Sequence, residues 1–558
     1  MKHKKLFIYI ISSVFIISSV AFVEDYFEVS RQLDIFSTAY REVNQYYVDD
    51  VKPGDLLKRG IGGMLKNLDP YTVYYPESEI EDYRLKHVGS EYGGIGASSF
   101  RKSDSIVIFD VHEGYAAQKA GLRIGDVLLE VNGRSIKNID PDEVDDLIRG
   151  QSNTSVKLRV MRLGQPLDFS LTREEIKSKN VPYFGMINDS VGYIKLDKFL
   201  QGCYDEMKTA VEELKKNEGM KSLIFDLRGN GGGLVDQTVE ILSLFMEKNT
   251  HVLSQKGKIS NANTKYDTKN EPLLGNIPMT ILIDRQSASA SEITAGNFQD
   301  IDRGVVIGQR SFGKGLVQQT RPLSYGTQFK VTIAKYYTNS GRCVQALNYA
   351  SRHEDGSVDH VPDSLISEFK TKNGRTVFDG SGVYPDRFIE PLVYSNITQS
   401  LINKLHIFDF ATWYRSHHDS IADPLTYKIS ESDYNEFIQF MEGREYSYKT
   451  ATENAYTELK SSMKDEKYYD KMQKEIDELG SKLRHNKSDD LINFKKEIKS
   501  VLEKEIISRY YYQNGRYKYS FRSDEVLNDA LTVLGNPALY QSILKGEGNY
   551  KVIGKPKK

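Results

Sequence analysis

Between residues 181 and 391, short apolar runs alternate with longer segments in which apolar residues recur every three or four positions. Two of the apolar runs are "SLIFDL" and "MTILI", and two of the amphipathic segments are "CYDEMKTAVEELKKN" and "LVDQTVEILSLF". Alternation of this kind is typical of a sheet whose strands are joined by helices. The sequence therefore predicts a core of the α/β class.

Changes in sequence texture divide the 558 residues into several regions, as expected for a chain of this length. Residues 25–91 carry helical periodicity, and residues 92–175 form short strands broken by glycine-containing turns. The α/β core is predicted over 176–392. Residues 393–558 are helical, charged and rich in tyrosine, and they match no motif. We therefore predict a helical N-terminal region, a β-rich domain, an α/β core and a helical C-terminal extension.

The N-terminus is typical of an exported protein. Basic "MKHKK" precedes 18 residues without a charge, Leu6–Val23, and acidic residues follow. This order predicts a signal peptide or signal anchor over residues 1–24, with its basic end in the cytoplasm. Eighteen residues just span a bilayer, and Ser19-Val20-Ala21 is only a weak cleavage site, so cleavage is left open. We expect the protein in the periplasm or cell envelope, either released or anchored to the inner membrane.

Charge and cysteine content argue against several classes of protein. A net charge of -2 gives no support for nucleic-acid binding. Two cysteines, Cys203 and Cys343, exclude a disulfide scaffold and a cysteine-rich zinc site, and leave one disulfide open. We predict neither a metal nor another cofactor. Aromatic and basic residues over Ser508–Arg522 could stack on bases, but a helix end followed by a hairpin turning at Asn514-Gly515 is the preferred interpretation.

Three serines in "SASASEITAGNFQD", residues 287–300, follow directly on an apolar run. Serine is unfavourable inside a helix and favourable where a helix begins. A hydroxyl at that position lies near free backbone N–H groups and the positive end of the helix dipole, which favour developing negative charge. The segment therefore predicts one half of an acyl-transfer site. Ser287 and Ser291 are interpreted as capping or packing residues, and Glu292 as a first-turn acid that suits the dipole.

An acyl-transfer site also needs a base, and none of the ten histidines has a suitable context near the serines. Lysine is the alternative, and Lys314 lies between two glycines in "SFGKGLVQQ". Lysine acts as a base only when it is neutral, so burial must lower its pKa by several units from about 10.4. The flanking glycines allow close backbone packing around it. Ser–Lys pairs are a known variant of the serine triad.

A glycine-rich loop, "DLRGNGGG" at 226–233, lies between a buried strand and a helix. Backbone N–H groups of such a loop can bind an oxyanion. A phosphate-binding loop is the alternative, but the segment lacks the GK[ST] ending of a P-loop.

Taken together, "DLRGNGGG", "SASASEITAGNFQD" and "GQRSFGKGLVQ" resemble the C-terminal processing peptidases, also called tail-specific proteases. These are serine–lysine endopeptidases with a ClpP/crotonase-like core and an inserted PDZ domain. The resemblance extends over residues 27–391. It implies that Ser289 is the nucleophile, that Lys314 is the base, and that Gln318 holds the lysine amine. Because Lys314 follows Ser289 by 25 residues, the spacing also agrees with the family pattern.

The oxyanion hole is predicted to consist of the backbone N–H groups of Gly231, Gly232 and Ala290. Residues 92–175 resemble a PDZ domain, because "YGGIGASSF" is similar to its carboxylate-binding loop and "AGLRIGDVLLEVNG" to its central stretch. N–H groups of Gly94, Ile95 and Gly96 would then bind a terminal carboxylate while the peptide adds as a strand. We expect protein or peptide partners with a free C-terminus. An adaptor protein and a second copy of the chain are left open.

The predicted function is that of an exported serine endopeptidase that cleaves proteins near their C-terminus. The alternative is a catalytically inactive PDZ scaffold that binds C-termini, and the presence of Ser289, Lys314 and Gln318 argues against it. A trypsin-like envelope protease would need a GNSGG-type serine and a usable histidine, and neither is found in the sequence.

Overall fold

The computed structural model describes residues 27–80, 83–84, 91–177, 179–353, 355–446, 448–483 and 487–555. The predicted signal segment, 1–24, lies outside the described residues. None of the helices in the described part is long and apolar enough to cross a membrane. The chain divides into two compact units, a smaller one that contains the described residues up to 80 with 318–333 and 348–359, and a larger one that contains the remainder.

The smaller unit begins with a helix over residues 27–46. Helix α2 (Pro53–Leu65) follows, with its proline in the first turn, where the missing N–H costs nothing. Strand β1 (Val73–Tyr75) pairs antiparallel with the first part of β18 (Gln328–Tyr337). The unit also contains all or most of three further elements: η1 (Glu77–Glu79), β17 (Leu316–Pro322) and β19 (Leu347–Arg352). Strand β19 pairs with β20 (Val358–His360).

Within the larger unit, residues 91–177 form a β-rich domain with its own buried core. Its main sheet has the order β3-β4-β5-β7-β8, with β6 paired to β5, and β2 pairs separately with β9. The strands are β2 (Glu91–Gly94), β3 (Ala97–Lys102), β4 (Ser105–Val111), β5 (Val127–Val131), β6 (Arg134–Ser135), β7 (Ser155–Arg162), β8 (Gln165–Thr172) and β9 (Glu174–Lys177). The helices are α4 (Ala116–Lys119) and α5 (Pro141–Ile148).

The α/β core is built on a six-stranded sheet of order β10-β11-β12-β15-β16-β23. All neighbouring pairs are parallel except β10 with β11. The strands are β10 (Tyr183–Met186), β11 (Val191–Lys195), β12 (Ser222–Asp226), β15 (Met279–Ile283), β16 (Val305–Gly308) and β23 (Arg387–Phe388). Strands β11, β12, β15 and β16 are buried along their whole length, which is typical of a parallel sheet covered on both faces.

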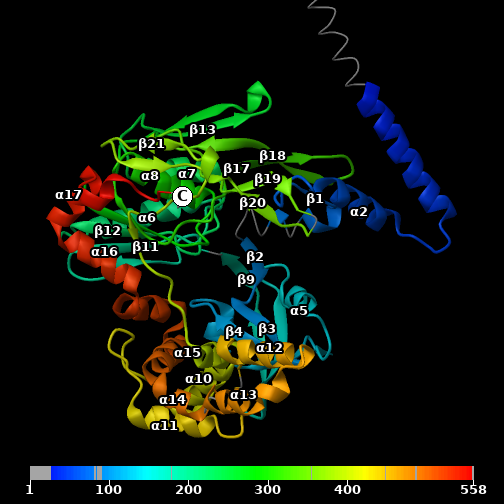
Figure 1. Ribbon diagram of the computed structural model, residues 1–558, viewed down its shortest axis with the longest axis vertical. Coiled ribbons are helices and arrows are strands. Elements are labelled where there is room, and N and C mark those ends of the chain that lie inside the picture. Colours follow the sequence, from blue (N-terminus) through cyan, green and yellow to red (C-terminus); the bar gives the residue numbers. More distant parts are fainter. Residues whose placement is uncertain are drawn as a thin grey trace, which may run out of the picture. The chain divides into compact units, whose positions relative to one another are not determined.

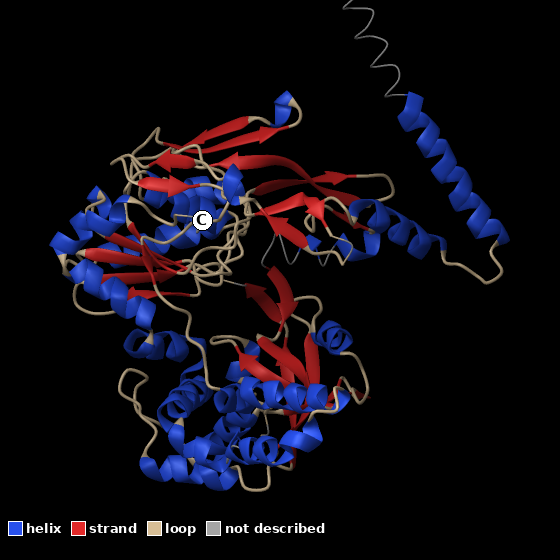
Figure 2. Cartoon of the chain, in the orientation of Figure 1, coloured by secondary structure: helices blue, strands red, loops and turns tan. Residues whose placement is uncertain are grey.

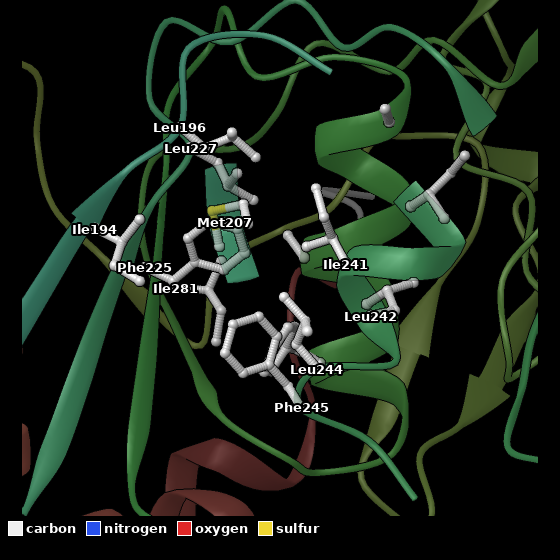
Figure 3. Close-up of a cluster of buried hydrophobic side chains, with 14 of the residues drawn as sticks. Ile194, Leu196, Met207, Phe225, Leu227, Ile241, Leu242, Leu244, Phe245 and Ile281 are labelled. Atoms are coloured by element: carbon white, nitrogen blue, oxygen red, sulfur yellow. The ribbon is translucent and has the colours of Figure 1, made fainter. Parts of the chain in front are cut away.

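Helices cover each face of this sheet (Figure 2). One face packs on α6 (Cys203–Lys215), α7 (Val235–Leu242) and α8 (Ala290–Asp300), and Figure 3 shows part of this core, including Phe225, Ile281 and Phe245. The other face packs on α16 (Glu525–Gly535) and α17 (Pro537–Lys545), drawn in red in Figure 1. The last part of the C-terminal extension therefore completes the hydrophobic core of the α/β domain.

Four further strands belong to the larger unit. β13 (His251–Gly257) pairs with β14 (Thr264–Asp267) and, through its second half, with the last four residues of β18. β21 (Glu368–Lys370) pairs with β22 (Thr376–Phe378). Cys203 and Cys343 are both free thiols, so the disulfide that the sequence left open is not formed.

The C-terminal extension is helical, as predicted. Its remaining helices are α9 (Asn396–Asn403), α10 (His406–His417), α11 (Glu431–Phe440), α12 (Ala451–Asp465), α13 (Tyr469–Leu483), α14 (Lys487–Asn493) and α15 (Lys495–Ser523), with η4 (Gly548–Lys551) near the end.

The hairpin predicted at Asn514-Gly515 is wrong, because α15 runs through both residues and is only kinked, at Tyr512. A Cβ on Gly515 would lie 2.4 Å from the Cβ of Tyr511 and 2.9 Å from Ile507. The glycine is therefore needed for close packing within the helix rather than for a turn.

Candidate active site

Three loops that follow neighbouring strands contain the predicted catalytic motifs. The glycine-rich loop follows β12, the serine segment follows β15, and the loop with Lys314 follows β16. These strands are adjacent and parallel. Because carboxyl ends of parallel strands meet at one edge of a sheet, the topology brings the three motifs together there.

Ser289 lies at the sharp turn between β15 and α8, immediately before the first helical residue, Ala290. Its backbone has φ 54° and ψ −111°, in a region that a residue with a Cβ rarely adopts. Strain of this kind costs about 1–3 kcal/mol and concentrates at functional sites. A strained strand-to-helix turn is also how nucleophilic serines are presented in other α/β enzymes.

The serines on either side of Ser289 fasten this turn to the glycine-rich loop. The Ser287 hydroxyl donates to the Leu227 carbonyl at 2.9 Å, and the Ser291 hydroxyl donates to the Asn230 carbonyl at 2.8 Å. The backbone N–H of Ala288 also donates to Asn230 O, at 3.0 Å. Both flanking hydroxyls are therefore packing residues of the site, which explains why three serines occur in this segment.

Glu292 connects the serine turn with the lysine loop. One carboxylate oxygen, Oε2, accepts from the backbone N–H of Ser289 at 2.9 Å and from that of Lys314 at 2.8 Å. The other, Oε1, accepts from the Ser311 hydroxyl at 2.5 Å and from Gly313 N at 2.6 Å. A single side chain thus holds the backbones of both predicted catalytic residues.

Glu292 is completely buried. Burial raises its pKa to about 7, although the hydrogen bonds from Ser311 and from three backbone N–H groups act in the opposite direction. The interpretation of Glu292 as a first-turn helix acid therefore missed its contacts with the loop that contains Lys314. Only its contact with Ser289 could have been anticipated from the sequence, because an acid three residues after a serine is the spacing of a capping box.

Lys314 is partly buried, and the glycines beside it pack closely, as predicted. A Cβ on Gly313, which has φ +91°, would lie 2.3 Å from the Ala346 Cβ, and one on Gly315 would lie 2.8 Å from Gln345 N. Gln318 belongs to the smaller unit, where its side-chain amide donates to Thr332 Oγ1 at 3.2 Å. Its role as the partner of Lys314 stays a prediction.

The glycine-rich loop lies directly against Ser289. A Cβ on Gly232, which has φ +97°, would lie 2.8 Å from both Ala290 N and the Ser289 Cβ. The N–H of Gly232 donates to Asn230 Oδ1 at 2.8 Å, so in this conformation it has a partner within the loop. Nothing lies within 4 Å of a Cβ placed on Gly231. Gly232 and Ala290 therefore lie close together beside Ser289, and Gly231 borders more open space.

The pair Gly232→Ala and Gly231→Ala tests this geometry. Gly232→Ala should lower the free energy of unfolding by about 1–3 kcal/mol and impair any activity at Ser289, because the new methyl group meets the serine turn and the backbone is left-handed. Gly231→Ala, with open space and no positive φ, should change stability by less than about 1 kcal/mol. Thermal and urea unfolding of both variants would measure the difference, and equal losses would contradict the assigned packing.

A buried ion pair supports the start of the glycine-rich loop. Arg228 donates to both oxygens of Asp226, at 3.0 Å from Nε and 2.6 Å from Nη2, and Tyr193 also donates to Asp226. Burial alone would raise the pKa of Asp226, but the charges of Arg228 and Lys195 outweigh it and lower the pKa to about 2. Arg228 Nη1 lies 2.7 Å from a carboxylate oxygen of Asp524, whose other oxygen caps α16. The C-terminal extension thus contacts the loop beside Ser289.

The loop predicted to bind a carboxylate is tightly packed in the β-rich domain. Gly94 ends strand β2, and the side chain of Ile95 is buried. Gly96 has φ +74°, and a Cβ there would lie 2.3 Å from the Tyr115 Cβ. Carbonyl groups of Ile95 and Gly96 accept from backbone N–H groups at 2.8 Å, which fixes the loop conformation. Binding of a terminal carboxylate by its N–H groups stays a prediction.

Among the described residues, one group could hold a metal ion. Ligand atoms of His418, Asp433 and Glu436 lie within 4.8 Å of one another. His418 follows α10, and Asp433 and Glu436 lie in α11, so all three residues belong to the C-terminal extension.

The site combines a strained serine at a helix start, a glycine-rich loop against it and a lysine loop held by the same carboxylate. These features, with a PDZ-like domain in the same chain, fit the class of PDZ-containing serine proteases. Comparison with known proteins agrees. Residues 190–350 match the family model of peptidase family S41, residues 107–162 match that of the PDZ domain, and residues 397–534 match that of a probable PDZ-protease C-terminal helical domain.

Relatives identify the family more closely. The chain is 33% identical over 322 residues to the carboxy-terminal-processing protease of Bartonella bacilliformis, covering 57% of this chain and 73% of that one. It is 34% identical over 353 residues to a probable CtpA-like serine protease of Staphylococcus aureus, covering 61% and 70%. A solved photosystem II D1 C-terminal processing protease has 25% identity, covers 64% and 93%, and gives a TM-score of 0.35. The chain belongs to the family of carboxy-terminal-processing serine proteases.

Proposed function

We propose that the protein is an exported endopeptidase that cleaves other proteins near their C-termini, with Ser289 as nucleophile and Lys314 as base. The observation that carries this proposal is the shared carboxylate of Glu292, which accepts from the backbone N–H groups of both residues. A buried group that fixes a serine and a lysine from separate loops fits a site in which the two act together.

In the proposed reaction, the Ser289 hydroxyl attacks a peptide carbonyl while neutral Lys314 takes its proton. The C–N bond then breaks, Lys314 passes the proton to the leaving amine, and water hydrolyses the acyl-enzyme in a second step of the same kind. Gln318 would orient the lysine amine. The ammonium form of Lys314 cannot accept a proton, so its amine must be neutral when the reaction begins.

Backbone N–H groups of Gly231, Gly232 and Ala290 would stabilise the oxyanion. The Gly232 N–H donates to Asn230 Oδ1, so it would have to exchange this partner for the oxyanion when substrate binds. Ala290 is the first residue of α8, so its N–H has no intrahelical acceptor and is available for an oxyanion.

The PDZ domain would bind the free C-terminus of the substrate through the loop Gly94–Gly96, and cleavage would occur further into the chain. The basic and apolar segment at residues 1–24 supports export to the periplasm or cell envelope. Unfolded proteins are the expected substrates, since an extended segment must reach both sites.

This function is tested with the purified full-length chain and an unfolded protein substrate with an apolar C-terminus, prepared with a free carboxylate and as the C-terminal amide. Mass spectrometry should find internal cleavage of the free form, much slower cleavage of the amide, and no products with Ser289→Ala. Equal cleavage of both forms would contradict recognition of the C-terminus. Tight binding of the free form without cleavage would instead favour the PDZ scaffold.

A further inference from the structure

Tyr336, in the last part of β18, places its hydroxyl between the two predicted catalytic residues. The phenol oxygen lies 2.8 Å from the Lys314 carbonyl and 3.2 Å from the Ser289 carbonyl. Its own backbone N–H donates to Gly315 O at 3.0 Å. The side chain is buried, with 1% of its surface exposed. No motif in the sequence singled out this residue.

Glu292 and Tyr336 form hydrogen bonds with different backbone groups of the same two residues. Glu292 accepts from the N–H groups of Ser289 and Lys314, and Tyr336 donates its proton to their carbonyl groups, more closely to that of Lys314. Both backbone polar groups of each catalytic residue are therefore bonded to these two buried side chains. We propose that Tyr336 is a positioning residue that, together with Glu292, sets the separation of Ser289 and Lys314. This inference rests on the proposed function.

The hydroxyl rather than the ring carries this role. A buried aromatic ring alone would fill the core equally well as phenylalanine, and would leave the Lys314 carbonyl without this donor. Burial, and then the nearby charge of Glu292, raise the pKa of Tyr336 well above its usual value, so that the phenol keeps its proton. The group is thus a hydrogen-bond donor at neutral pH.

The separation of Ser289 and Lys314 matters for the proposed reaction. Proton transfer from a serine hydroxyl to a lysine amine requires a separation close to hydrogen-bond length. Ser289 and Lys314 follow different strands, β15 and β16, so their spacing depends on what joins the two loops. Displacements of about 1 Å can cost about 100-fold in rate. A donor that bridges the two carbonyls would restrain such displacements without contacting the substrate.

The test compares Tyr336→Phe with Tyr337→Phe in the full-length chain. Tyr337 is the next residue of β18, and its ring packs against the Lys256 ammonium, 4.5 Å from the ring centroid. Steady-state kinetics should show kcat about tenfold lower for Tyr336→Phe with KM changed less than about twofold, and both values near those of the parent for Tyr337→Phe. A purely structural role would not separate kcat from KM in this way.

Hydrogen exchange followed by mass spectrometry measures the restraint itself, independently of proteolysis. In Tyr336→Phe, peptides covering both 285–295 and 309–317 should exchange faster, and in Tyr337→Phe they should not. Unchanged exchange in both segments, or faster exchange with an unaltered kcat, would overturn the proposal. If the parent cleaves no substrate, the proposed function fails, and the exchange data alone decide whether Tyr336 holds the two loops.

Discussion

Lys314→Ala is expected to lower kcat/KM by about 10³-fold or more while leaving the fold intact. Removal of the proposed base would leave the serine hydroxyl without a proton acceptor, and only the proposed oxyanion donors and substrate binding would still contribute. Lys314 is only partly buried and its backbone N–H is held by Glu292, so loss of its side chain should barely affect unfolding. Cleavage of the free-carboxylate substrate, measured beside circular dichroism, checks both parts.

Lys314→Arg is the matched control, because it keeps a long cationic side chain that cannot become neutral in a protein. It should be as inactive as the alanine variant. In the parent, kcat/KM should fall as the pH decreases, since the ammonium form of Lys314 is not a base. A rate independent of pH between about 5 and 9, or appreciable activity of Lys314→Arg, would contradict the role of lysine.

Glu292→Gln is expected to lower the free energy of unfolding by about 2–4 kcal/mol. It should also lower kcat by about as much as the removal of a catalytic side chain would. Four donors converge on its two carboxylate oxygens. An amide replaces one oxygen by a donor, so two of those four groups would face an N–H₂ group in a buried site. If Glu292 only complemented the helix dipole, glutamine would cost a few tenths of a kcal/mol.

Glu453→Gln is the matched control, since Glu453 occupies the same capping-box position in α12, a helix without buried residues. It should cost less than about 1 kcal/mol. Equal losses at the two positions would contradict the bridging role of Glu292. Urea unfolding gives both values, and the kinetic assay shows whether only Glu292→Gln loses activity.

The pKa of Glu292 also predicts how stability changes with pH. Burial raises its folded-state pKa to about 7, above an unfolded value of about 4.3. Its contribution to stability is therefore fully present below about pH 4.3 and is lost as the pH rises through about 7. The free energy of unfolding of the parent should therefore decrease as the pH rises over this range, and that of Glu292→Gln should not show this decrease.

Much of the architecture could be predicted because its signals are local. Alternating apolar runs and amphipathic segments predicted the α/β core, and short strands with glycine-containing turns predicted the β-rich domain. Its assignment as a PDZ domain came from the resemblance of two of its segments to that family. The hairpin predicted at Asn514-Gly515 failed because α15 continues through both residues and buries Gly515, which overrides the usual turn preference. Closure of the second face of the sheet by α16 and α17 was not predicted, because burial against strands more than 200 residues away leaves no local signal.

Local motifs also predicted part of the candidate site, and contacts between distant residues were again missed. Ser289, Lys314 and the glycine-rich loop were singled out as candidates from their motifs, and the structure brings these segments together at one edge of the sheet. Tyr336 was missed because a tyrosine in a mixed polar and apolar strand, next to a second tyrosine, resembles any packing residue. The contact of Glu292 with Lys314 joins residues 22 positions apart, one in α8 and one in the loop after β16, and the parallel pairing of β15 with β16 brings them together.

The central claim is that Ser289 is a nucleophile activated by Lys314. It is tested most directly by treating the full-length chain with a fluorophosphonate, which labels activated serines, and locating the adduct by peptide mass spectrometry. We predict a single adduct on Ser289 that is formed by the parent and by Glu453→Gln and is lost in Lys314→Ala. Labelling of a different residue, or undiminished labelling of Ser289 without the lysine, would contradict the account.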